Sequence, residues 1–438
     1  MSHTESPSVP DAPAIGQLRL VVAGSVDDGK STLVGRLLHD TKSILADQYD
    51  ATLAASQRRG AGDFDLALLT DGLRAEREQG ITIDVAYRYF STPRRSFVLA
   101  DTPGHVQYTR NTVTGASTAD AAVVLIDVRN GVSVQTRRHA ALLALLRVPT
   151  VVFAVNKMDA VDWSQERFEQ VAADVRDVAA KVGLRGVDVV PVSALTGENI
   201  VDGGPSWYAG KPLLPLLEEL PSGGTGEFEP FRFPVQLVIR PRTETHPDYR
   251  GLAGRVASGT VRVGDEITAQ PSGQTSTITG IDGPAGPQQH ATAGESVTLL
   301  LADELDIARG EVLVRDSETE QWGSAIGVLR QIDGVLTWLS EKDSAPRQRV
   351  LVKAGTRTVR AMLGPVTATW DADELTWRNQ GDRLCLNDIG QVSVQLAEPV
   401  ALDAYAELRG TGAFLVIDPD TGATIAAGLA GASDRLAV

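Results

Sequence analysis

Residues 24–31 read Gly24-Ser25-Val26-Asp27-Asp28-Gly29-Lys30-Ser31, between the apolar run 18–23 and a helix-like segment that continues from Thr32. A buried strand, a glycine-rich turn and the first turn of a helix therefore follow one another, which is the order of a phosphate-binding loop. Glycines at both ends allow the backbone to curl so that its N–H groups point at a polyphosphate, and the helix N-terminus adds a partial positive charge. The loop and Thr32 are thus predicted to bind a nucleoside triphosphate, with Lys30 reaching the β- and γ-phosphates and the Ser31 hydroxyl holding Mg²⁺.

The strand and helix around this loop belong to a longer alternating pattern. Helix-like stretches such as 135–147 and 165–181 alternate with short apolar runs at 18–23, 96–100, 121–126, 150–155 and 187–192. This alternation predicts a layered α/β domain with a largely parallel sheet over 15–220. Residues 1–14, which carry Ser, Pro and Asp, are expected to form a disordered tail.

After a Pro- and Gly-rich linker expected at 221–229, the helical periodicity stops. Strand-like pieces at 234–239, 251–257 and 275–281, separated by turn signals, predict one all-β barrel domain over 230–316. A second all-β barrel domain is predicted over 317–438, with strands at 349–353, 356–361, 366–370, 391–396 and 413–417. The pattern leaves open that both β segments form one sandwich.

Composition narrows the classes of function. The chain has 438 residues, with 41 Lys and Arg against 56 Asp and Glu, and a formal net charge of −15. Such an acidic surface argues against non-specific nucleic-acid binding, although one local basic face is compatible with that total. The single cysteine, Cys385, cannot form an internal disulfide, which fits a reducing cytoplasm. The apolar runs are too short to cross a membrane, so we expect neither membrane insertion nor a targeting segment.

The stretch Asp101-Thr102-Pro103-Gly104-His105 follows the predicted strand 96–100. A carboxylate at the end of a strand beside a phosphate-binding loop can hold Mg²⁺, usually through water, and the N–H of Gly104 can sense a γ-phosphate. His105 is then expected to orient the attacking water. Asp-x-Pro-Gly alone is a common turn, but its position on the neighbouring strand favours the functional interpretation.

Two further stretches predict recognition of guanine. Asn156-Lys157-Met158-Asp159 follows the strand 150–155, and Ser193-Ala194-Leu195 follows the next one. The Asp159 carboxylate can accept hydrogen bonds from N1–H and from the exocyclic amine of guanine, which adenine does not offer in that geometry. A main-chain N–H of the second stretch is expected to meet the guanine O6. The triphosphate is therefore predicted to be GTP.

A switch is expected at Gly80-Ile81-Thr82-Ile83, between the first two motifs. Thr82 can close over Mg²⁺ when a γ-phosphate is present and release it after hydrolysis. We therefore expect Ser31, Thr82 and Asp101 to hold the metal ion. Lys30, Thr82 and His105 are the expected catalytic residues.

With these elements in place, the chain resembles the translation-factor class of P-loop GTPases, whose elongation factors join a GTP-binding domain to two β-barrels. Translation factors usually carry histidines in the phosphate-binding loop, whereas this chain has Ser25 and Asp28. The resemblance is closer to the large GTPase subunit of sulfate adenylyltransferase. The similar stretches are Glu76–Phe90, Gln107–Asn111, Gly115–Asp120, Phe231–Gln236, Arg240-Pro241 and Arg250–Gly254.

This resemblance implies that GTP hydrolysis on the chain drives the first step of sulfate assimilation. In that family, a separate, smaller adenylyltransferase subunit binds ATP and sulfate and forms adenosine 5′-phosphosulfate (APS) in a heterodimer. No second phosphate-binding loop is found, so APS kinase activity is not expected. Two alternatives stay open at this point: an elongation-factor-like GTPase that carries aminoacyl-tRNA, and a non-hydrolysing scaffold that uses GTP only for assembly.

Overall fold

The computed structural model divides into two compact units, Met1–Gly223 and Gly224–Val438. The residues that it describes are 15–44, 66, 85–102, 109–221, 226, 229–241, 249–315, 326–379 and 381–431. The expected tail, most of the expected linker, Thr82 and the stretch 103–105 lie outside these ranges. Within the described ranges, no helix combines the length and the apolar character needed to cross a membrane.

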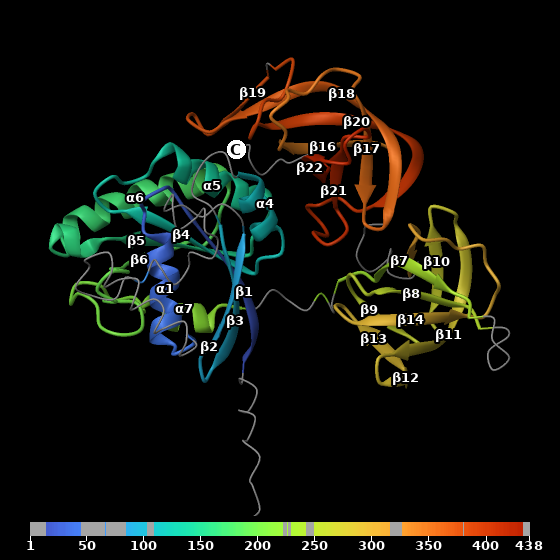
Figure 1. Ribbon diagram of the computed structural model, residues 1–438, viewed down its shortest axis with the longest axis horizontal. Coiled ribbons are helices and arrows are strands. Elements are labelled where there is room, and N and C mark those ends of the chain that lie inside the picture. Colours follow the sequence, from blue (N-terminus) through green and yellow to red (C-terminus); the bar gives the residue numbers. More distant parts are fainter. Residues whose placement is uncertain are drawn as a thin grey trace, which may run out of the picture. The chain divides into compact units, whose positions relative to one another are not determined.

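A six-stranded sheet forms the centre of the first unit, in the order β2-β3-β1-β4-β5-β6 (Figure 1). The strands expected from the apolar runs are all present and all parallel, as predicted. They are β1 (Ile15–Gly24), β3 (Arg95–Asp101), β4 (Ala121–Asp127), β5 (Thr150–Asn156) and β6 (Asp188–Pro191). Their carboxyl ends therefore share one edge of the sheet, where a ligand site is expected in an open parallel sheet.

The edge strand β2 (Ala86–Ser91) was not predicted and pairs antiparallel with β3. Its residues alternate between exposed and more buried positions, so it contains no continuous apolar run. One of its side chains, Phe90, is buried and stacks on Phe97 of β3, with ring centroids 4.6 Å apart. The ladder with β3 attaches the strand to the sheet, and a single buried side chain leaves only a weak pattern in the sequence.

Helices cover both faces of this sheet. They are α1 (Lys30–Asp40), α4 (Thr109–Ser117), α5 (Val134–Leu145), α6 (Gln165–Val182) and α7 (Leu213–Glu219). The helix α5 begins at a capping box formed by Ser133 and Thr136, and α6 ends at Gly183, which has a positive φ of 80°. Both helices lie within two residues of their predicted ranges.

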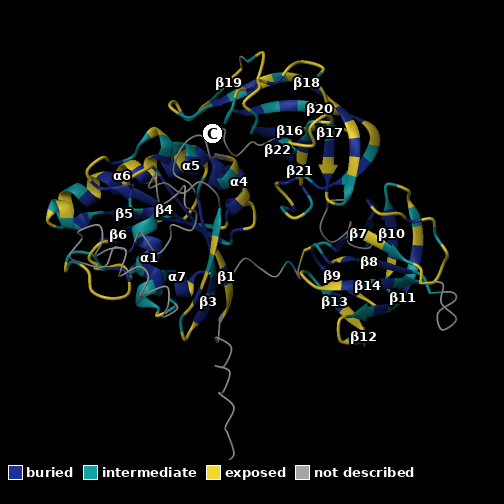
Figure 2. Cartoon of the chain, in the orientation of Figure 1, coloured by how far each residue is buried: buried dark blue, intermediate teal, exposed yellow. Residues whose placement is uncertain are grey.

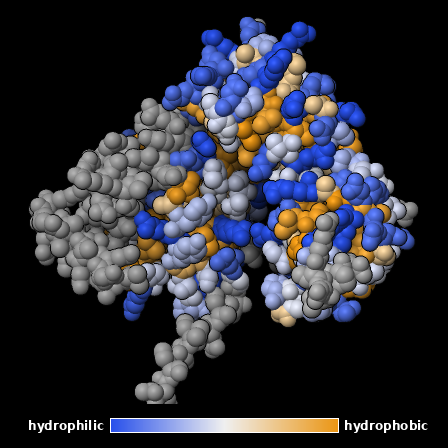
Figure 3. Space-filling model, turned by 45° about the vertical axis from the view of Figure 1, so that its right-hand side comes forward, coloured by the Kyte–Doolittle hydropathy of each residue, from blue (hydrophilic) through white to orange (hydrophobic). Residues whose placement is uncertain are grey.

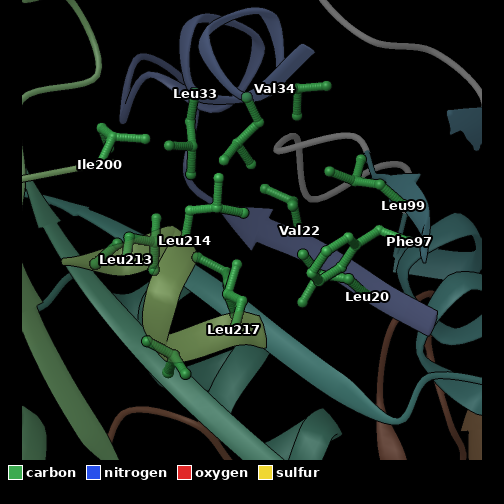
Figure 4. Packing of buried hydrophobic residues seen from close by; sticks show 14 of the residues in the cluster. Leu20, Val22, Leu33, Val34, Phe97, Leu99, Ile200, Leu213, Leu214 and Leu217 are labelled. Carbon is green, nitrogen blue, oxygen red and sulfur yellow. The ribbon is translucent and has the colours of Figure 1, made fainter. Parts of the chain in front are cut away.

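The face of the sheet under α1 and α7 carries an apolar core (Figure 4). Leu20 and Val22 of β1 point toward Leu33 of α1 and Leu217 of α7, and all four side chains are at most 1% exposed. The strand β4 is buried along its whole length, as a central strand covered on both faces must be (Figure 2). The phosphate-binding loop starts from β1, whose last five residues, 20–24, are all buried.

The second unit contains two separate antiparallel barrels, each with its own core, so the sandwich alternative is wrong. In the first barrel, pairing of β10 with β11 closes a ring of six strands. The ring contains β7 (Arg232–Ile239), β8 (Gly251–Arg255), β10 (Glu266–Gln270), β11 (Gln274–Gly283), β14 (Ser296–Leu301) and β15 (Val312–Val314). The short strands beside it are β9 (Thr260–Arg262), β12 (Gly286–Gln288) and β13 (His290–Thr292).

The second barrel closes in the same way, through pairing of β17 with β18. Its strands are β16 (Gly327–Trp338), β17 (Arg349–Ala354), β18 (Arg357–Asp371), β20 (Ile389–Leu402), β21 (Ala413–Ile417) and β22 (Thr424–Ala430), with β19 (Thr376–Arg378) at the margin. The predicted separate strands 356–361 and 366–370 are one strand, β18. The dipeptide Gly364-Pro365, which has the composition of a turn, instead lies at an irregularity of the ladder between Leu363 and Val366.

The two barrels are joined inside the second unit by a buried ion pair. Arg232, at the start of β7, donates hydrogen bonds to both carboxylate oxygens of Asp403, at 2.9–3.2 Å. Both side chains are at most 4% exposed. Outside the cores, hydrophilic and hydrophobic side chains are mixed over the visible surface of the barrels (Figure 3), as expected for strands with one buried and one solvated face.

Candidate nucleotide-binding site

The loop that follows β1 is closely packed at both of its glycines. Gly24 and Gly29 have positive φ angles of 153° and 93°. A Cβ atom at Gly29 would lie 2.4 Å from Nδ2 of Asn156, and one at Gly24 would lie 3.0 Å from the carbonyl oxygen of Leu125. Because no side chain fits at either position, the loop depends on glycine at both ends, as the sequence pattern predicted.

Lys30, the first residue of α1, folds back over this loop. Its Nζ donates hydrogen bonds to the carbonyl oxygens of Gly24 at 2.8 Å and Ser25 at 2.7 Å. The side chain is only 7% exposed, and burial lowers the pKa of the ammonium group, against the opposing charges of Asp101, Asp28 and Asp27. A concentrated positive charge is therefore held at the mouth of the loop.

Asp101 lies at the carboxyl end of β3, in register with Val22 of β1. Its side chain is 1% exposed, and its charge acts on the ammonium group of Lys30. The next residue, Thr102, donates its hydroxyl to the carbonyl oxygen of Val22 at 2.8 Å. The phosphate-binding loop and the stretch that begins at Asp101 therefore follow neighbouring strands. Ser31, which follows Lys30, lies in the first turn of α1.

Asn156 connects the phosphate-binding loop to the loop after β6. Its Nδ2 donates to the carbonyl oxygen of Asp28 at 2.8 Å, and its Oδ1 accepts from the N–H of Ala194 at 2.9 Å. The side chain is 2% exposed, so both bonds are shielded from water. One amide side chain therefore holds together three stretches that are far apart in the sequence.

The residues around Asn156 orient the predicted base-recognition carboxylate. The hydroxyl of Ser193 donates to Oδ1 of Asp159 at 2.6 Å. Arg36 of α1 donates to the carbonyl oxygens of Ala194, at 3.2 Å, and Leu195. The Leu195 side chain is left 67% exposed. The loop after β6 is thereby fixed to α1 as well as to β5.

Lys157 and Met158 complete the second motif. Lys157 adopts a left-handed φ of 64°, and its ammonium group donates to the carbonyl oxygen of Asp27. Met158 is fully buried at the start of a short 3-10 helix, Met158–Val161. Val26, in the phosphate-binding loop, has an exposed side chain. The carboxyl ends of β1, β5 and β6 are therefore connected by direct hydrogen bonds.

Sequence reasoning missed Asp127, a carboxylate at the end of β4. It accepts hydrogen bonds from Arg129 at 2.6–3.0 Å and lies 3.0 Å from Nζ of Lys157. Burial acts to raise the pKa of its carboxyl group, but the hydrogen bonds from Arg129 and Lys157 prevail and lower it to about 2. The available signal was its position directly after the apolar run 121–126, at the same edge of the sheet as the recognised motifs.

Two residues of the α5 region were also missed. The hydroxyl of Ser133, which caps α5, lies 3.0 Å from the hydroxyl of Ser25 in the loop. His139, on α5, is 1% exposed, and its pKa is lowered to about 3 by burial and by the charge of Lys30. The histidine is therefore neutral at physiological pH and forms part of the support beneath the loop. No spacing rule connects either residue to the loop in advance.

The polar groups at this edge fit a magnesium nucleotide. Within the described ranges, no group of three or more His, Cys, Asp or Glu side chains could hold a metal ion. The predicted ligands are instead the Ser31 hydroxyl, from the residue after Lys30 in α1, and the Asp101 carboxylate, whose charge acts on Lys30. This sparse, all-oxygen set is suited to Mg²⁺, which is usually held by one or two protein oxygens together with phosphate oxygens and water.

Comparison with known protein families gives a consistent result along the chain. The Elongation factor Tu GTP binding domain matches residues 17–223, and Elongation factor Tu domain 2 matches residues 252–314. The GTP-eEF1A C-terminal domain-like family matches residues 331–430. Among solved structures, Sup35 complexed with GMPPNP aligns over 96% of this chain and 95% of that chain, with 22% identity and a TM-score of 0.42.

Curated relatives are more similar. Sulfate adenylyltransferase subunit 1 of Methylorubrum extorquens (strain PA1) is 48% identical over 416 residues, which are 94% of this chain and 86% of that protein. The subunit 1 of Cellvibrio japonicus is 46% identical, with the same coverage. The bifunctional enzyme CysN/CysC of Mycobacterium tuberculosis (strain H37Rv) is 47% identical over 94% of this chain and 67% of that protein. The chain is therefore an enzyme subunit of the sulfate adenylyltransferase subunit 1 family, built from an elongation-factor-type GTPase domain and two β-barrels.

Proposed function

We propose that this chain binds and hydrolyses GTP, and that hydrolysis drives the synthesis of APS from ATP and sulfate on a smaller partner subunit. The observation that carries this proposal is Asn156, whose side chain joins the phosphate-binding loop to the loop after β6. Such a connection couples recognition of a phosphate to recognition of a base. The names of the relatives support sulfate adenylyltransferase as the enzyme in which this coupling is used.

At the phosphate end, the main-chain N–H groups of 24–32 and the ammonium group of Lys30 are proposed to hold the β- and γ-phosphates. The Ser31 hydroxyl and the Asp101 carboxylate are proposed to hold Mg²⁺, together with Thr82. When bound, Mg²⁺ neutralises charge that develops on the phosphate oxygens. The burial of Lys30 and Asp101 supports these roles, because charges act more strongly where water is excluded.

At the base end, Asp159 is proposed to accept hydrogen bonds from N1–H and the exocyclic amine of guanine. The hydroxyl of Ser193 already holds one oxygen of this carboxylate at 2.6 Å, which fixes its plane before a base arrives. The main chain of 193–195 is proposed to donate to O6. A base without these two donors would leave the carboxylate desolvated and without partners from the base. A lost hydrogen-bond partner of this kind discriminates between bases more strongly than a difference in apolar contact does.

Hydrolysis is assigned to residues outside the described ranges. We propose that Gly104 senses the γ-phosphate, that His105 orients the attacking water and that Thr82 closes over Mg²⁺. The loss of these contacts after hydrolysis releases the switch, and the change reaches the partner subunit as a shift between two conformations. The mixed phosphosulfate anhydride of APS lies high in free energy, so its synthesis must be coupled to a favourable reaction such as GTP hydrolysis.

The test mixes the purified chain with its small partner subunit, ATP and sulfate, and measures APS with and without GTP. We expect GTP to raise APS formation, and we expect His105→Ala to bind GTP normally but to lose both hydrolysis and the GTP effect. A complex in which GTP leaves APS formation unchanged would refute the proposal. Hydrolysis by neither form, with normal assembly, would favour the scaffold alternative, and GTP-dependent filter binding of charged tRNA would favour the elongation-factor alternative.

A further inference from the structure

Asp28 is an acidic side chain enclosed within the phosphate-binding loop. Its Oδ2 accepts a hydrogen bond from the N–H of Ser25 at 2.6 Å, and the side chain is buried at 6% exposure. The carbonyl oxygen of the same residue accepts from Nδ2 of Asn156 at 2.8 Å. The carboxylate is therefore fixed by the loop itself and does not extend into solvent.

The N–H group that holds this carboxylate is fixed in turn. The Ser25 hydroxyl lies 3.0 Å from the hydroxyl of Ser133 at the start of α5. Ser133 is itself held by Thr136 in the capping box, with their hydroxyl oxygens 2.9 Å apart. Neither end of the bond between Ser25 and Asp28 is free to swing away. The negative charge of Asp28 therefore occupies one position beneath the loop.

The charges around Asp28 do not cancel it completely. The nearby cation Lys30 interacts with Asp101 and Asp27 as well as with Asp28. The cations Lys157 and Arg129 are engaged by Asp127, whose charge repels that of Asp28. Burial raises the pKa of Asp28, and the hydrogen bond from Ser25 and the charge of Lys30 oppose this effect. An ionised carboxylate at this point thus adds negative potential within the loop that is proposed to hold the phosphates.

We propose that the carboxylate of Asp28 weakens the binding of nucleotides without touching them, and so speeds the release of GDP. A polyphosphate carries several negative charges, and repulsion across a loop that excludes water is only partly screened. The consequence is that the GTPase cycle of this chain renews its nucleotide by spontaneous exchange. This inference rests on the proposed GTP binding, because it concerns the affinity of that same site.

The test compares GDP binding and release in the wild type and in Asp28→Asn, with a fluorescent GDP analogue and the full chain. Asn keeps an oxygen that accepts from Ser25 but removes the charge. We expect the dissociation constant to fall about tenfold, which corresponds to about 1.4 kcal/mol, with most of the change in the release rate. The matched control is Asp177→Asn on α6, which removes the same charge from an exposed side chain paired with Lys181 and is expected to change neither quantity.

Two further variants distinguish the effect of charge from the effect of loop structure. Asp28→Ser also offers a neutral acceptor and should bind GDP more tightly if the charge is responsible, whereas Asp28→Ala removes the acceptor and should bind it more weakly than Asp28→Asn. If folded Asp28→Asn and Asp28→Ser bind GDP no more tightly than the wild type, the inference is wrong. A wild-type chain that binds no guanine nucleotide would instead overturn the proposed function.

Discussion

Replacing Asn156 by alanine removes a side chain that connects the phosphate-binding loop with the loop after β6. Two buried main-chain groups lose their partners: the carbonyl oxygen of Asp28 and the N–H of Ala194. Each such group costs about 1–3 kcal/mol when it is left buried and unpaired, so the substitution costs about 2–6 kcal/mol. This cost is present with or without nucleotide, so it lowers the free energy of unfolding; the affinity for guanine nucleotide falls separately, because the two loops must then be ordered on binding.

Titration with fluorescent GDP and urea unfolding measure the two consequences of Asn156→Ala. We expect the free energy of unfolding to fall by about 2–6 kcal/mol. We also expect the dissociation constant for GDP to rise about tenfold, which corresponds to about 1.4 kcal/mol for ordering the two loops on binding. The control is Arg95→Met, since Arg95 is fully buried at the opposite end of β3 and donates to the carbonyl oxygens of Gly16 and Glu218 at 3.2 Å. It should lower stability but leave GDP affinity within about twofold, because it is remote from the site. Asn156→Ala with wild-type GDP affinity would refute the reasoning.

The remaining predictions concern stability. Asp403→Ala leaves the buried charge of Arg232 without its carboxylate partner and should lower the unfolding free energy by about 3–5 kcal/mol. The double variant Arg232→Met/Asp403→Leu should recover most of that loss. Equal losses in the single and double variants, measured by urea unfolding, would contradict this. Asp127 has a pKa of about 2 in the folded chain, against an ordinary value of 3.8 for an aspartate side chain. Because the folded pKa is the lower one, this group contributes about 2 kcal/mol above pH 4, which is lost as the pH falls through 2. Asp127→Asn should make the free energy of unfolding depend less on pH between about pH 4 and pH 2. An unchanged pH dependence would show that Asp127 does not contribute this free energy.

The parallel strands of the first unit could be predicted because strands buried on both faces appear as continuous apolar runs. The run 121–126 is the clearest example, since β4 is buried at every position. The edge strand β2 escaped prediction because only Phe90 among its residues is buried. In the second barrel, Gly364-Pro365 resembled a turn, whereas cross-strand pairing on both sides continues β18 through it. Pairing between distant strands overrides local composition in such cases.

The candidate site divides in a similar way. The glycines and Lys30 of the first motif are tied to local backbone geometry, so a short stretch of sequence suffices to find them. The bond between Ser25 and Ser133 spans 108 positions, and the bond between Asn156 and Ala194 depends on the order of β5 and β6 in the sheet. Contacts between such distant residues can be predicted only when the order of the strands in the sheet is known, and local sequence patterns do not give that order.

A guanine nucleotide is proposed to act on this chain rather than on its partner. In Asp159→Asn, an amide replaces the carboxylate that is proposed to accept from guanine. Xanthosine triphosphate (XTP) carries a carbonyl in place of the exocyclic amine of guanine, so the new amide can donate to it.

The most direct measurement is APS formation by the complex of Asp159→Asn with the partner subunit, ATP and sulfate, as GTP or XTP is added. The account predicts that XTP raises APS formation in the variant while GTP no longer does, and that the wild-type complex shows the reverse preference. A variant complex that GTP still stimulates as strongly as the wild type would contradict it.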